Sequence, residues 1–422
     1  AKRIGPRGGA TVMSVCIFGE SALEFMRSSG RLAPEFLDKP RTQKLDGCGV
    51  SPKAMFTDAM ERLGVKTRPV HILVSKESGA RSRDDIVCHR SAAELPPRSL
   101  IYVNRDVLVT SPALTFLHLA TVDLHKKRQR TVEELALIGL ELCGTYLLDD
   151  SWDGLTNTAK PLTSVEQITR VLDAMPGAPG IVRAREALEL VGDGSNSPME
   201  SVLCALLTWP RRLGGYALGP VSLNHRVSTA DGDRYVDVAF PGHKVGLEYK
   251  GRKFHAIEQA GRDDRRQNKL VGSGWTILNV WYEDIVEEHL YNQLVADVAR
   301  AMGIRLRIRS GGFDARRNVL RMQLIPAFKR YAAALARYLA KIQERRQSRG
   351  RERRRGVRSV RGHGACLRRV IGAKGRRKTR PEPGYRICTW QLVIVAIAAS
   401  CAAGRRRTGR DSPRAGPRAG AP

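Results

Sequence analysis

Residues 234–250 read RYVDVAFPGHKVGLEYK, and this stretch decides the fold class of the chain. Its two halves, RYVDVAF and KVGLEYK, are rich in β-branched and aromatic residues, which predicts two strands. Pro241-Gly242 stands between them, where a turn is expected. The stretch therefore predicts a β-hairpin.

Three charged residues of this hairpin suggest chemistry. Asp237 lies mid-strand between valines, and Glu248 and Lys250 occupy alternate positions of the second strand. Side chains alternate between the faces of a strand, so Glu248 and Lys250 share one face, and pairing of the strands can bring Asp237 to it. A solvated strand face is the alternative interpretation of Glu248 and Lys250. An aspartate among valines has no ready structural explanation.

Two converging carboxylates repel each other and are costly to bury. A hard divalent cation, Mg²⁺ or Mn²⁺, removes that cost because it prefers oxygen ligands. Such an ion polarises a phosphoryl oxygen and activates water, and Lys250 could orient this water or stabilise the developing charge. The pattern predicts phosphodiester hydrolysis, with the cation between Asp237 and Glu248.

The residues around the hairpin predict further helices and strands. Ser197-Pro198 is typical of a helix start, and that helix should run to about Trp209. An extended segment begins at Val221, a charged helix is expected over 258–271, a strand from Trp275 and a helix over 284–302. The order helix, three strands, helix, strand, helix predicts a mixed sheet with helices on both faces.

The earlier part of the chain also shows strand and helix signals. Residues 99–111 predict two strands about a turn at 104–106. Ser111, Thr131 and Ser164 are each expected to cap the start of a helix.

Four segments together resemble a known family. They are SPME at 197–200, YVDVAFP to VGLEYKGRKFH at 235–255, DDRRQNKL at 263–270 and GWTILNVWYED at 274–284. This pattern is similar to the very-short-patch-repair-like endonuclease domain of the PD-(D/E)xK superfamily. That domain is common in actinobacterial proteins, some of them related to abortive-infection antitoxins. The resemblance covers about 115 of the 422 residues and implies a restriction-endonuclease-like α/β fold.

The resemblance also implies roles for single residues. Asp237 and Glu248 match the metal ligands, Glu200 an additional acidic member, and His255 a general acid or base. Lys250 departs from the close relatives, which often have Asp there, although it fits the wider superfamily. Glu200 also stands three residues after Ser197, as in a capping box, and His255 could be an ordinary turn residue. The basic residues expected to bind nucleic acid are Arg252, Lys253, Arg265 and Arg266, of which the last two could instead lie on a solvated helix face.

Composition divides the chain into five parts. Residues 345–422 hold 23 Lys and Arg against three Asp and Glu, so this Arg-rich tail carries +20 of the net charge of +30 and leaves +10 for residues 1–344. The tail has too little apolar surface to fold, so we expect a disordered extension or out-of-frame translation of a GC-rich gene; binding of nucleic acid is the alternative interpretation. The expected parts are an upstream extension (1–12) before Met13, a smaller α+β domain (13–192), the nuclease domain (193–310), a helical extension (311–344) and the tail (345–422).

The sequence thus predicts a magnesium-dependent endodeoxyribonuclease, with a DNA-binding or antitoxin-like regulator as the alternative. A structural or interaction module is a third, weaker hypothesis. DNA is the expected partner, and residues 13–192 could contact a protein. The eight cysteines form no Cys-x-x-Cys pair, and the apolar run at 392–399 is shorter than a membrane span of about 20 residues, so the expected location is the cytoplasm.

Overall fold

The structure, a computed structural model, describes residues 14–28, 33–50, 53–91, 94–121, 129–148, 155–250, 267–308 and 311–325. The chain divides into two units, residues 1–344 and 345–422, and every described residue belongs to the first. The segments 1–12 and 345–422, expected to be an upstream extension and a tail, lie outside the described residues.

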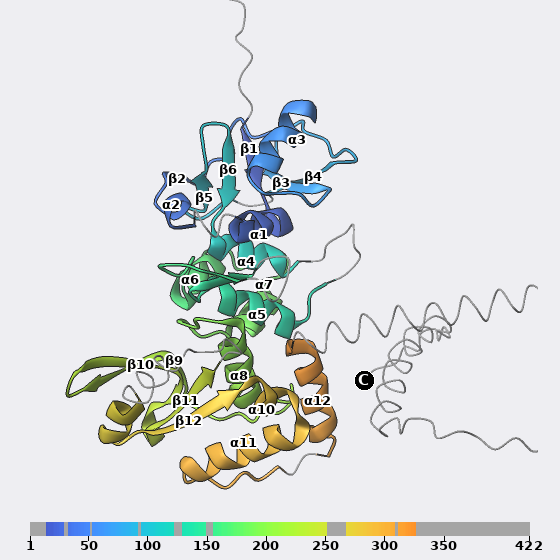
Figure 1. Cartoon of the computed structure of the whole chain (residues 1–422). Coiled ribbons are helices and arrows are strands. Elements are labelled where there is room, and N and C mark those ends of the chain that lie inside the picture. The colour runs from blue at the N-terminus through green and yellow to red at the C-terminus, as the bar shows by residue number, and fades with distance from the viewer. Residues whose placement is uncertain are drawn as a thin grey trace, which may run out of the picture. The chain divides into compact units, whose positions relative to one another are not determined.

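A mixed six-stranded sheet occupies the N-terminal part (Figure 1), in the order β2-β5-β6-β1-β3-β4. The pairs β1–β6 and β3–β4 are parallel, and the other neighbours are antiparallel. The two strands expected on either side of residues 104–106 are confirmed as an antiparallel pair. The elements are β1 (Val15–Ile17), α1 (Gly19–Ser28), α2 (Ala33–Leu37), β2 (Arg41–Thr42), α3 (Lys53–Arg62), β3 (Val70–Val74), β4 (Ile86–Arg90), β5 (Leu100–Tyr102) and β6 (Val107–Thr110).

Four helices and a short strand pair follow. Three of the helices begin where the sequence predicts, because the side chains of Ser111, Thr131 and Ser164 accept a hydrogen bond from a backbone N–H of the first turn. Helix α4 contacts α1, and α5 contacts α8 of the next part. The elements are α4 (Pro112–Leu119), α5 (Val132–Leu142), β7 (Tyr146–Leu148), β8 (Leu155–Asn157), α6 (Val165–Ala174) and α7 (Ile181–Leu188).

The C-terminal part is built on a four-stranded sheet in the order β12-β11-β10-β9. Strands β9, β10 and β11 are antiparallel neighbours, and β12 joins β11 in parallel. Figure 1 shows α8 and α11 beside these strands. The mixed α/β class is confirmed. The elements are α8 (Pro198–Thr208), β9 (Ser222–Thr229), β10 (Gly232–Phe240), the 3₁₀ turn η2 (Pro241–His243), β11 (Val245–Lys250), β12 (Thr276–Trp281), α10 (Tyr282–Val286), α11 (Glu288–Ala301) and α12 (Phe313–Leu324).

One large apolar core runs through the described residues. Its members extend from Val15 to Ile325, so the core continues across the domain boundary expected at residue 192. A second, small cluster lies in the four-stranded sheet and contains Val236, Ala239 and Trp275. No described helix is both long enough and apolar enough to cross a lipid bilayer.

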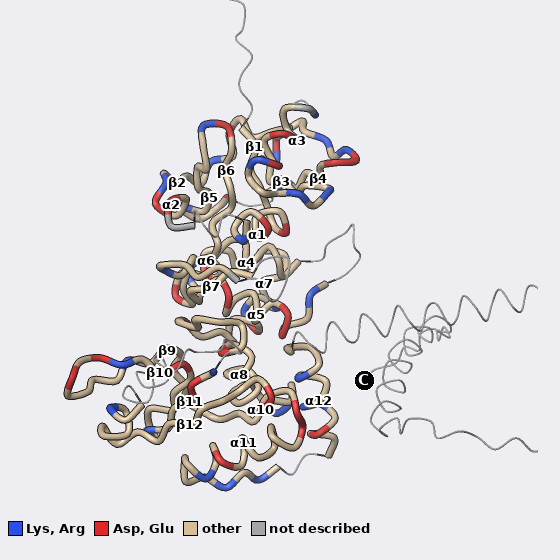
Figure 2. Tube along the Cα trace, viewed as in Figure 1, with Lys and Arg blue, Asp and Glu red and all other residues tan. Residues whose placement is uncertain are grey.

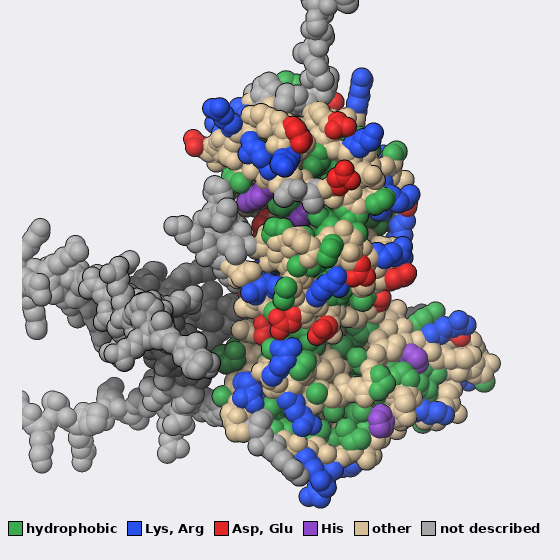
Figure 3. Space-filling model, turned by 180° about the vertical axis from the view of Figure 1, so that it is seen from behind, with side chains coloured by type: hydrophobic (Ala, Val, Ile, Leu, Met, Phe, Trp, Pro, Cys, Tyr) green, Lys and Arg blue, Asp and Glu red, His purple; other side chains and the backbone are tan. Residues whose placement is uncertain are grey.

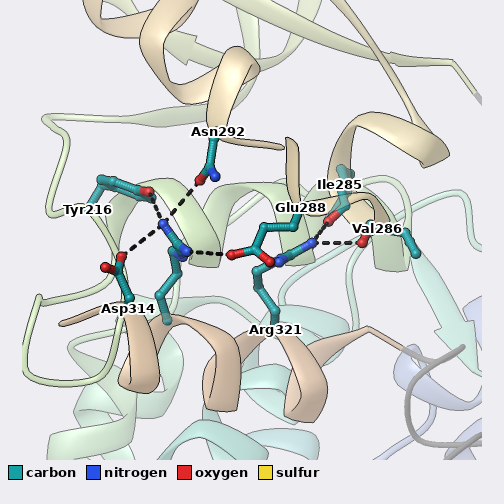
Figure 4. Close-up of polar contacts among 8 residues, drawn as sticks. Tyr216, Ile285, Val286, Glu288, Asn292, Asp314 and Arg321 are labelled. Carbon is teal, nitrogen blue, oxygen red and sulfur yellow. Dashed lines mark hydrogen bonds and ion pairs between the residues drawn. The ribbon is translucent and has the colours of Figure 1, made fainter. Parts of the chain in front are cut away.

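The single helix expected over 284–302 is wrong, because the structure has two helices separated by an extended Glu287. Because the break interrupts the helical hydrogen-bonding pattern, the carbonyl oxygens of Ile285 and Val286 need other donors. One guanidinium nitrogen of Arg321 donates to both, at 2.9 and 2.8 Å (Figure 4). A side chain from α12 therefore stabilises the break.

A second buried arginine of α12, Arg317, bonds to side chains of α11 (Figure 4). Arg317 donates to the Tyr216 hydroxyl, the Asn292 amide oxygen and the Glu288 carboxylate at 3.1–3.3 Å. Asp314 adds an ion pair one turn away on α12. Buried charges need such partners, so these bonds specify how α12 packs against α11.

Candidate metal centre

The site lies where the ladder between β10 and β11 ends. The last paired residues are Val238 and Leu247, and the next residues in register are Asp237 and Glu248. Beyond that point the Tyr249 N–H donates to the Asp237 Oδ2 at 2.8 Å. The predicted hairpin is confirmed, and its register brings the Asp237 carboxylate alongside β11, next to Glu248.

Strand β10 is distorted at Asp237. Simple alternation would put Val236 and Val238 on one face, yet Val238 belongs to the large core and Val236 to the small cluster. On β9, Asn224 lies between the partners of these two valines and has a left-handed φ of 46°. Such local irregularities in a sheet are frequent beside active sites, where they re-aim a side chain.

Glu200 enters the site from the first turn of α8. The Ser197 Oγ accepts from the Glu200 N–H at 3.2 Å, and the Glu200 Oε2 accepts from the Asn196 N–H at 2.8 Å. The side chain is buried, with 7% of the residue exposed. Burial and the negative charge of Asp237 raise the pKa of Glu200 to about 7. The structure therefore brings the carboxylates of Glu200 and Asp237 together.

Glu248 and Lys250 meet on one face of β11, as their spacing predicts. The Lys250 Nζ donates to the Glu248 Oε2 at 2.8 Å, and Glu248 is 5% exposed. In the parallel ladder with β12, Asn279 lies beside Glu248 and Trp281 beside Lys250. Figure 2 shows acidic and basic residues close together where β11 passes α8.

Three elements thus contribute a carboxylate each, and β11 adds an ammonium group. Among the described residues, no three His, Cys, Asp or Glu side chains are arranged as a metal-binding set. Mg²⁺ is often held by only one or two carboxylates, with water and substrate phosphate completing its shell. Burial is the main cause of the raised pKa of Glu200 and the negative charge of Asp237 is the second, and a nearby cation would offset the Asp237 contribution. Asp237 and Glu248, which are opposite each other in register, supply the oxygen ligands that such an ion prefers.

The remaining predicted site residues cannot be placed. His255, Arg252, Lys253, Arg265 and Arg266 lie within 251–266, outside the described residues. On the face shown in Figure 3, Lys and Arg of the described part are interspersed with acidic and apolar side chains.

Sequence reasoning missed the residues that support Glu200. The segment 192–197 has the Gly, Ser and Asn content of a linker, but its Asn196 N–H binds the Glu200 carboxylate. The only signal in the sequence was the start of α8 at Ser197.

Comparison of the chain with protein-family descriptions, curated proteins and solved structures finds no match. The residues and their geometry therefore carry the functional proposal.

Proposed function

We propose that the chain is a metal-dependent endonuclease that hydrolyses DNA phosphodiester bonds, with a restriction-endonuclease-like domain at 193–310. One observation carries the proposal. The buried Glu200 carboxylate lies near enough to Asp237 for that charge to raise the pKa of Glu200, and both lie where the β10–β11 ladder ends before Glu248. A buried carboxylate with a perturbed pKa beside a second acidic group is typical of functional sites.

Asp237 and Glu248 would hold Mg²⁺ or Mn²⁺, which supplies Lewis acidity toward a phosphoryl oxygen and a more acidic water. Lys250 would leave its ion pair with Glu248 to stabilise the charge that develops on the phosphate. Glu200 would add negative charge at the same point, and His255 would serve as a general acid or base. Arg252, Lys253, Arg265 and Arg266 would bind the DNA backbone.

A DNA-binding regulator without nuclease activity is the second candidate. Two observations favour it: the Lys250 Nζ already neutralises Glu248, and the described residues contain no three-membered metal-binding set. This function needs the fold and positive charge but no cation. It predicts salt-sensitive DNA binding that divalent metal does not change.

Cleavage of supercoiled plasmid by the full chain in Mg²⁺ or Mn²⁺ tests the proposal. The double variant Asp237→Asn/Glu248→Gln is expected to lose at least about 100-fold in rate, because the ion contributes several kcal/mol to transition-state stabilisation. Asp233→Asn is the matched control, since Asp233 lies on the same strand but pairs with Arg226. This variant should cleave like the wild type.

Cleavage that survives the double substitution would refute the nuclease proposal. An unchanged gel shift in chelator, with no cleavage under any condition, would establish the regulator instead. Absence of both cleavage and DNA binding would refute both the nuclease and the regulator.

A further inference from the structure

We propose that Tyr146 and Thr145 are positioning residues for the candidate site, so that the part before residue 192 controls how Glu200 is presented. The functional meaning of this proposal rests on the proposed metal site. Neither residue is placed in the site itself. Their effect passes through residues 194–197, called the α8 entry turn below, which directly precede α8.

The first link is backbone pairing between residue 145 and the α8 entry turn. The Thr145 N–H donates to the Ser195 carbonyl oxygen at 2.8 Å, and the Thr145 Oγ1 donates to the Asn196 Oδ1 at 2.6 Å. The approach depends on Gly144, because a Cβ there would lie 2.5 Å from the Ser195 carbonyl oxygen. The two segments therefore meet at a distance that only glycine permits.

The second link is a chain of buried hydroxyl groups. The Ser195 Oγ donates to the Ser197 carbonyl oxygen at 3.0 Å, and the Ser201 Oγ donates to the Ser195 Oγ at 2.8 Å. A serine hydroxyl has one proton, so the Tyr146 hydroxyl, 2.9 Å from the Ser201 Oγ, must donate to it. Tyr146 is 2% exposed, and Ser195 and Ser201 are fully buried. Water cannot readily replace these bonds.

The α8 entry turn then holds the carboxylate. The Asn196 N–H donates to the Glu200 Oε2, and the Ser197 Oγ accepts from the Glu200 N–H. The Asn196 side chain accepts from Thr145, so both the side chain and the backbone N–H of Asn196 are hydrogen-bonded. Movement of β7 would therefore shift the donor that orients Glu200. Partners that hold a group near a metal commonly tune metal affinity.

The test is titration of Mn²⁺ into the full chain by calorimetry. Tyr146→Phe is expected to weaken Mn²⁺ binding by about 10-fold, as outer-shell substitutions do. Ser21→Ala is the control: it also removes a buried hydroxyl from the N-terminal part, where Ser21 accepts from the His71 N–H at 3.0 Å. This control should leave Mn²⁺ affinity unchanged even where it lowers the melting temperature.

A double-mutant cycle separates positioning from a general structural effect. In a Glu200→Gln background, Tyr146→Phe should weaken Mn²⁺ binding no further, because it acts through Glu200. An equal loss in both backgrounds, or wild-type affinity in Tyr146→Phe, would overturn the inference.

Failure of the proposed function is distinguishable from failure of the inference. If the wild type binds no Mn²⁺, the metal site is refuted, and hydrogen exchange of the Asn196 amide decides the inference. Faster exchange in Tyr146→Phe, with wild-type exchange in Ser21→Ala, supports positioning of the α8 entry turn by Tyr146. Unchanged exchange in Tyr146→Phe overturns it.

Discussion

Glu200 takes part both in the start of α8 and in the candidate site, the two roles that its sequence position allowed. Its spacing from Ser197 predicted a capping box, and the Ser197 Oγ does accept from the Glu200 N–H. The return bond, however, reaches back to the Asn196 N–H instead of the Ser197 N–H. The same carboxylate is close to Asp237. Local spacing could predict the cap, but the approach to Asp237 depends on how α8 packs against β10, which no short segment encodes.

Glu200→Gln is expected to raise the free energy of unfolding at pH 8 but not at pH 4, in buffer without divalent cations. Burial and Asp237 raise the pKa of Glu200 from 4.5 to about 7. The folded state therefore binds this proton more tightly, and the resulting stability is complete below pH 4.5 and lost as the pH rises through about 7. The gain at pH 8 is at most about 3 kcal/mol.

Urea unfolding of both proteins at the two pH values measures this difference. Glu166→Gln is the control, because Glu166 occupies the first turn of α6 but is exposed. An equal effect of Glu200→Gln at pH 4 and pH 8 would contradict the assignment.

At the scale of elements, helix starts were predictable and one helix break was not. Ser111, Thr131, Ser164 and Ser197 each cap the helix that the sequence placed after them, because capping depends on neighbours three residues apart. The break at Glu287 is stabilised by Arg321, which lies 35–36 residues away from the two carbonyl groups it binds. A periodicity argument confined to 284–302 cannot detect such a partner.

Arg321→Met is expected to lower the free energy of unfolding by roughly 2–3 kcal/mol, because it leaves two carbonyl groups at the α10–α11 break without their donor. Arg300→Met on α11 is the control, since the Arg300 side chain is 73% exposed. Equilibrium unfolding in urea compares the two variants. Equal, small losses would show that Arg321 does not stabilise the break.

At the scale of the whole chain, most of the net charge and the described apolar core lie in different parts of the sequence. The tail 345–422 carries +20 of the +30 net charge, whereas every member of the large described core lies between Val15 and Ile325. Composition could predict this division because net charge and apolar content are both counted directly from the sequence. The boundary expected at residue 192 is a different case. The Gly, Ser and Asn residues of 192–197 resemble a linker, yet in the structure Ser195 bonds to the buried Ser201 and Asn196 bonds to Thr145.

Removal of residues 345–422 is expected to leave the melting temperature unchanged and to weaken DNA binding. The slope of log affinity against log salt should become shallower by about 0.9 for each phosphate that the tail neutralises in the full chain. Fluorescence anisotropy with a labelled duplex at several salt concentrations measures the slope. A slope that stays the same would show that the tail binds no phosphates, and a lower melting temperature would show that it contributes to the fold.

The distortion of β10 at Asp237 limits how this strand can evolve. Because the strand rotates there, Val236 packs into one apolar cluster and Val238 and Phe240 into another, and residues 236 and 238–240 are all fully buried. Mutational drift in this segment is then confined to apolar exchanges of similar volume. Asp237 interrupts that run with a half-buried carboxylate that accepts from the Tyr249 N–H at 2.8 Å, so an apolar exchange at this one position would deprive a backbone amide of β11 of its acceptor.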